Sequence, residues 1–84
     1  MEIKGDTIIF KSSHDFFVKE RDGTKPNTIR NLNDFERIVL EEWCKRTSYQ
    51  TIRIQLKDHP AIYFTRALTD ISEWNGYHIF SWSV

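Results

Sequence analysis

Polar and apolar residues alternate strictly over residues 51–57, which is the pattern of a half-buried β-strand. Residues 58–60 are turn formers and end this strand in the prediction. Residues 61–69 are rich in β-formers and predict a further strand. Asn75-Gly76 is a strong hairpin signal, after which residues 77–84 predict a terminal strand. The second half of the chain is therefore expected to form consecutive strands.

The first half of the chain shows helical signals instead. A helix over residues 34–46 is predicted by Asn33 as N-cap with Glu36 three residues later, a variant of the capping box. A shorter helix is expected over about residues 14–22, ended by Gly23 in a left-handed conformation. The apolar stripe that should face the core from the longer helix consists of Phe35, Ile38, Val39 and Trp43.

A short β-rich segment, residues 7–10, precedes both helices, with residues 1–4 as a paired or frayed lead-in. Two early helices and a run of late strands predict the α+β class. We expect a single domain over residues 1–84: a small, mostly antiparallel curled sheet or partial β-barrel with two helices.

Composition narrows the function classes. Twelve basic and twelve acidic residues give zero formal net charge, which argues against strong non-specific binding to duplex nucleic acid. No long apolar segment or signal-like N-terminus occurs, so we expect a cytoplasmic location and no membrane partner. Cys44 is the only cysteine and the three histidines are isolated, so neither a metal site nor a cofactor is predicted.

The segment from Gly23 to Arg30 concentrates most of the candidate binding chemistry. Gly23 allows a sharp change of direction, and Pro26 keeps the residue before it out of the helical region. A purely structural role is the alternative, because the segment also suits a turn and Arg30 has Asp34 and Glu36 nearby in sequence. The residues expected to converge on an anionic or polar ligand are Lys25, Asn27, Thr28 and Arg30.

Three residues of the late strands complete the predicted ligand site. Arg66 and Asp70 lie close together in sequence and offer a cation and a carboxylate, although Asp70 also suits a strand end. Of the aromatic residues Trp74, Tyr77 and Trp82, we expect only one to be exposed, since a small core needs the others. Trp74, beside the hairpin turn, is the residue expected to stack on a base.

The spacing Gly23-x-Lys25-x-x-Thr28-x-Arg30 resembles the entry motif of ASCH domains, which have a PUA-like fold. It is also similar to the motif of small bacterial amidohydrolases that act on N4-acetylcytidine. The resemblance implies that Lys25 is a base or proton shuttle and that Thr28 is a nucleophile, assisted by a glutamate. This chain lacks the helical insertion that carries the glutamate in those enzymes. The carboxylates nominated in its place are Glu41, Glu42, Asp70 and Glu73.

The chain as a whole resembles small proteins of phages and prophages in its K-E-x-x-G-x-K-P-N-T-x-R stretch, residues 19–30. It resembles them also in Thr69-Asp70-Ile71-Ser72-x-Trp74 and in a terminal Ile-x-Ser-Trp, residues 79–82. That resemblance implies a location in the host cell cytoplasm but no particular activity. Our leading hypothesis is a module that binds a nucleotide, a modified nucleoside or short RNA. The alternatives are an amidohydrolase acting on acylated nucleosides and a phage protein that binds and inhibits a host protein.

Overall fold

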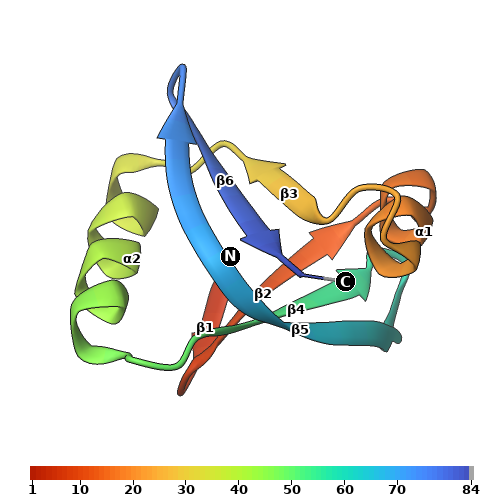
Figure 1. Cartoon of the computed structure of the whole chain (residues 1–84), viewed down its shortest axis with the longest axis horizontal. Coiled ribbons are helices and arrows are strands. Elements are labelled where there is room, and N and C mark those ends of the chain that lie inside the picture. Colours follow the sequence, from red (N-terminus) through yellow and green to blue (C-terminus); the bar gives the residue numbers. More distant parts are fainter. Residues whose placement is uncertain (84) are drawn as a thin grey trace.

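Six strands and two helices make up the computed structural model, which describes residues 1–83 (Figure 1). The predicted α+β class with two helices is confirmed, while the predicted strand end at Val84 lies outside the described residues. In chain order the elements are β1 (Glu2–Lys4), β2 (Thr7–Ser12), α1 (His14–Asp22), β3 (Asn27–Arg30), α2 (Asp34–Arg46), β4 (Thr51–Leu56), β5 (His59–Trp74) and β6 (Tyr77–Trp82).

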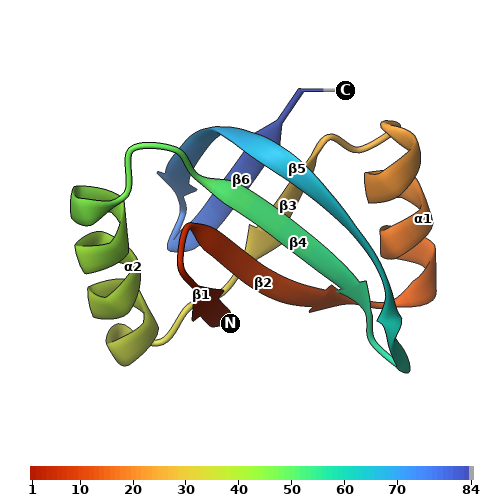
Figure 2. The same ribbon diagram turned by 90° about the horizontal axis from the view of Figure 1, so that it is seen from below.

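The strands form one curled sheet in the order β1-β2-β4-β5-β6-β3. All neighbouring strands are antiparallel except β2 and β4, which run parallel. The first half of β5 pairs with β4 and the second half with β6, and the register shifts between Leu68 and Asp70. This long strand bends across the molecule and carries the sheet around (Figures 1 and 2). The predicted curled, mostly antiparallel sheet is therefore confirmed, and it is open, with β1 and β3 as its edge strands.

Local signals in the sequence set the end of α1 and the start of α2. Gly23 has φ 86° and ends α1 in the left-handed region, where a Cβ would be strained. Asn33 Oδ1 accepts a hydrogen bond from Glu36 N at 2.8 Å, and Glu36 Oε1 accepts one from Asn33 N at 3.1 Å, which completes the capping box of α2. Neither helix within residues 1–83 is long and apolar enough to cross a membrane.

The strand predicted over residues 61–69 is longer in the structure. It begins at His59 and ends at Trp74, so of residues 58–60 only Asp58 lies in the turn between β4 and β5, and His59 and Pro60 belong to β5. Pro60 is tolerated inside β5 because the register with β4 shifts between Gln55 and Leu56, which leaves Pro60 without a paired residue.

The predicted apolar stripe of α2 is wrong for its first two members. Phe35 is 73% exposed and Ile38 is 62% exposed, whereas Leu40 and Trp43 are buried. The helix covers one end of the curled sheet, opposite α1, so only a narrow face of it reaches the core (Figures 1 and 2). Trp43 is fully buried, and its Nε1 donates to Gly5 O at 2.9 Å, which ties α2 to the turn between β1 and β2.

The exposure of the late aromatics also differs from expectation. Trp74 is exposed, as predicted, but Tyr77 is exposed as well, and only Trp82 is buried. Both exposed rings flank the Asn75-Gly76 turn, where the two turn residues have φ 52° and 83°. A tight turn of this kind at the tip of a two-stranded ribbon leaves its flanking side chains without a third layer to pack against.

Candidate functional site

The residues of the Gly23 to Arg30 segment are brought to a seam between β2 and β3. Gly23 ends α1, and Lys25 N donates to Lys19 O at 3.0 Å, so the chain turns back beside the helix it has just left. Pro26 O then accepts from Trp82 N at 3.1 Å, which begins the pairing of β3 with β6. The other edge of β3 has no strand partner, and it faces the end of β2 across the opening of the curled sheet.

A buried carboxylate lies at the centre of this seam. Glu20, on α1, is only 1% exposed. Its Oε1 accepts a hydrogen bond from Ser12 Oγ at 2.7 Å, and its Oε2 lies 3.6 Å from Lys25 Nζ. A buried charge is costly unless it is paired and hydrogen-bonded, and Glu20 has both kinds of partner. Lys25 Nζ also donates to Asn27 O at 2.9 Å, which fixes the ammonium group near the carboxylate.

Arg30 bridges the seam from β3 to β2. Its Nη1 donates to Lys11 O and its Nη2 to Ser12 Oγ, both at 2.7 Å. Its Nε donates to Thr28 Oγ1 at 2.9 Å, and the guanidinium carbon lies 4.8 Å from the centre of the Phe10 ring. Burial lowers the pKa of Arg30 from its ordinary value, and the negative charge of Glu20 opposes that shift. The guanidinium remains charged, since an arginine does not lose its proton in a protein.

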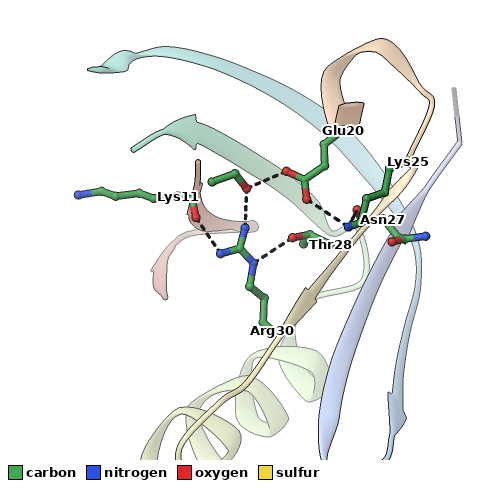
Figure 3. A network of polar contacts seen from close by, with 7 residues as sticks. Lys11, Glu20, Lys25, Asn27, Thr28 and Arg30 are labelled. Atoms are coloured by element: carbon green, nitrogen blue, oxygen red, sulfur yellow. Dashed lines mark hydrogen bonds and ion pairs between the residues drawn. The ribbon is translucent and has the colours of Figure 1, made fainter. Parts of the chain in front are cut away.

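The Ser12 hydroxyl joins these two charged groups into one network. Its oxygen accepts from Arg30 while its proton goes to Glu20, so Arg30 and Glu20 are linked without direct contact. Figure 3 shows the resulting chain of contacts from Thr28 through Arg30, Ser12 and Glu20 to Lys25. Thr28 is buried and accepts the bond from Arg30, so its own hydroxyl proton is left for a second partner.

A cavity of about 340 Å³ opens beside this network, within the size range of small-molecule sites. Its polar lining comes from Lys11, Ser12, Ser13, Glu20, Lys25, Thr28 and Arg30. Its apolar lining comes from Phe16 and Ile29, whose side chains are both about half exposed. The cavity therefore joins hydrogen-bonding groups of both charges at its floor to accessible apolar surface at its walls.

The structure brings together three of the four predicted ligand residues of the segment. Lys25, Thr28 and Arg30 all line the cavity. Asn27 participates through its main-chain carbonyl, whereas its side-chain amide points away from the network (Figure 3). Alternation along a strand explains the difference, because the side chain of Asn27 lies on the opposite face of β3 from that of Thr28.

The three predicted ligand residues from the late strands are placed elsewhere. Arg66 donates from Nη2 to Arg21 O at 3.1 Å, at the end of α1, and lies over the Phe64 ring. Asp70 is exposed at the register shift of β5, and Trp74 is exposed beside the hairpin turn. Arg66, Asp70 and Trp74 are thus not among the residues that line the cavity at the seam.

The carboxylate beside Lys25 and Thr28 is Glu20, which the sequence analysis did not nominate. The sequence contains one signal that could have identified Glu20. Glu20 follows Phe16 and Phe17 by four and three residues, so it lies on the same side of α1 as the aromatic residues. An acid on the apolar side of a short helix is either solvated or held by a buried partner, and only the fold decides between the two.

Cys44 has no features of a nucleophile. It lies on the exposed side of α2, and partial burial raises the pKa of its thiol, while a hydrogen bond with Gln50 acts in the opposite direction. The reactive thiolate is therefore scarce at neutral pH. Within residues 1–83, no group of three or more His, Cys, Asp or Glu side chains is placed to hold a metal ion.

Comparison with known proteins assigns the chain to no family. No protein-family model matches the chain, and no curated protein matches it significantly. The resemblance to ASCH domains and to phage proteins therefore stays a prediction.

Proposed function

We propose that the cavity at the seam binds a nucleotide or modified nucleoside. The observation that carries this proposal is that one small cavity combines two kinds of surface. Polar side chains that are hydrogen-bonded to one another form its floor, and half-exposed apolar side chains form its walls. A nucleobase presents donors and acceptors along its edge and an apolar surface on its two faces. A ligand of that shape can pair its edge with the floor while its faces contact Phe16 and Ile29.

Specific groups in the cavity match this chemistry. The Thr28 proton and the remaining hydrogens of Lys25 are donors, and Glu20 is an acceptor. Lys25 Nζ also lies 5.6 Å from the centre of the Phe16 ring, so a base stacked on Phe16 would lie close to a positive charge. A phosphate or ribose extending from the base would meet the cations Lys25 and Arg30.

Lys25→Met is expected to weaken ligand binding about 10- to 100-fold, because a charge-assisted hydrogen bond contributes about 1.5–3 kcal/mol. Calorimetric titration with nucleosides, N4-acetylcytidine and nucleotides at low salt measures the effect. The matched control is Lys45→Met, which removes the same charge from the exposed surface of α2 at the opposite end of the molecule. Equal affinities for the wild type and for Lys25→Met, or no binding by the wild type, would refute the proposal.

Hydrolysis of an acylated nucleoside is a second candidate, favoured by the position of Glu20 beside Lys25 and Thr28. In such a reaction Thr28 Oγ1 attacks the amide carbon, and Lys25 relays the hydroxyl proton to the leaving nitrogen. The C–N bond breaks and the acyl group stays on Thr28 as an ester. Water then cleaves that ester, which releases the carboxylic acid and restores the hydroxyl.

Incubation with N4-acetylcytidine tests this candidate, with cytidine formation followed by chromatography. Thr28→Val removes the hydroxyl at nearly constant volume and is expected to abolish turnover, while Thr28→Ser keeps a hydroxyl and should retain part of it. Binding without turnover by the wild type would leave a binding module and exclude hydrolysis of this substrate.

A further inference from the structure

Three side chains form a row on the outer surface of the sheet, next to the cavity at the seam. Lys11 of β2 is in register with Gln55 of β4, and Gln55 is in register with Tyr63 of β5. Residues in register on adjacent strands point to the same face of a sheet, and adjacent strands lie about 4.8 Å apart. We call Lys11, Gln55 and Tyr63 the outer row.

The outer row is continuous with the cavity through Lys11 and Arg30. A second cavity, of about 420 Å³, lies on the other side of Arg30 and is lined in part by Lys11, Arg30 and Gln55. Because Lys11 and Arg30 line both cavities, they mark the border between the two. A ligand longer than one nucleotide could pass over this border from the first cavity to the outer row.

Tyr63, at the far end of the outer row, has the features of a stacking surface. Its side chain is 50% exposed, and the guanidinium carbon of Arg53 lies 4.5 Å from the centre of its ring. Arg53 also has a buried Nε without a hydrogen-bond partner among residues 1–83. An accessible aromatic ring with a cation against it is the unit with which proteins hold the bases of single-stranded nucleic acids.

Cations outnumber acids along this path. Lys11 is exposed, and its ammonium has no ion-pair partner within the described residues. Arg30 and Arg53 add two further cations. Glu2 is the acid that lines the second cavity, and it pairs with Lys4 at 3.5 Å. A neutral protein thus carries a local positive path between the first cavity and Tyr63.

We infer that this surface binds single-stranded nucleic acid, with one nucleotide in the first cavity and its neighbour on the outer row. The flanking phosphate lies at Lys11 and Arg30, and the neighbouring base stacks on Tyr63. This inference rests on the proposed function, since it extends the same site from a single nucleotide to a strand.

The test compares a fluorescent tetranucleotide with a mononucleotide in binding titrations. The wild type should bind the tetranucleotide more tightly. Tyr63→Ala should weaken tetranucleotide binding about 5- to 100-fold, the range for loss of one stacked base, and leave mononucleotide binding unchanged. Lys11→Met should reduce the salt dependence of tetranucleotide binding by about 0.7 units of slope, the value for one phosphate contact on a single strand.

Two controls separate this inference from general surface effects. Tyr63→Phe keeps the ring and should bind as the wild type does, and Tyr49→Ala removes an exposed tyrosine outside the outer row and should change nothing. Equal tetranucleotide binding by the wild type and Tyr63→Ala, with mononucleotide binding intact, overturns the inference alone. Absence of both kinds of binding in the wild type overturns the proposed function as well.

Discussion

Glu20→Ala is expected to lower the free energy of unfolding by about 3–5 kcal/mol, the range for removing one partner from a buried ion pair. Glu20 is buried and holds two groups in place: Ser12 through a 2.7 Å hydrogen bond and Lys25 through a 3.6 Å ion contact. Without the carboxylate, the Ser12 hydroxyl loses its acceptor, and Lys25 and Arg30 are left as two cations at one seam. Urea unfolding followed by circular dichroism measures the difference.

The control for this prediction is an acid on the surface. Glu42→Ala removes an exposed carboxylate that lies 3.7 Å from Lys45 on α2, and it should change stability by less than about 1 kcal/mol. Glu20→Gln keeps a side-chain oxygen for Ser12 and should fall between the two. An unfolding midpoint for Glu20→Ala equal to that of Glu42→Ala would show that the seam does not depend on the carboxylate.

Trp43→Ala is the second substitution with a large expected effect, a loss of about 3–5 kcal/mol. The side chain is fully buried, and its indole nitrogen donates to Gly5 O, so its removal leaves a large cavity and an unpaired carbonyl. Together with Leu40, it attaches α2 to the rest of the core. Because small domains have total stabilities of only about 5–15 kcal/mol, the variant should be close to unfolding at 37 °C.

The matched controls for Trp43→Ala are substitutions at two other residues of the predicted apolar stripe. Phe35→Ala and Ile38→Ala should each cost less than about 1 kcal/mol, because both side chains are mostly exposed. Thermal and urea unfolding of the three variants measures the ranking directly. Large losses for Phe35→Ala or Ile38→Ala would mean that α2 packs through a different face.

Elements governed by neighbouring residues could be predicted from the sequence. The end of α1 follows from Gly23, the start of α2 from the pair of Asn33 and Glu36, and the last hairpin from Asn75-Gly76. These signals operate through contacts between residues at most a few positions apart, so they act in almost any fold. The α+β class could be derived from them together with the two periodicities of the chain.

The site was only partly predictable for the same reason. The segment from Gly23 to Arg30 was recognisable by its residue types, and Lys25, Thr28 and Arg30 do line one cavity. The identity of the carboxylate depended on which face of α1 meets the end of β2, and no short-range rule states that. Glu20 therefore looked like an ordinary surface acid, while Asp70 looked like a partner although it lies elsewhere.

The sequence alone determined where α1 ends and where α2 begins, the last turn, the fold class and the segment in which the candidate chemistry is concentrated. Tertiary structure decided which face of α2 is buried, which acid meets Lys25, and that Lys11, Gln55 and Tyr63 share one surface. The physical reason is the sequence separation over which each kind of interaction acts. Backbone geometry and capping are settled within about one helical turn, whereas a buried ion pair or a row across three strands requires residues far apart in sequence to be packed together.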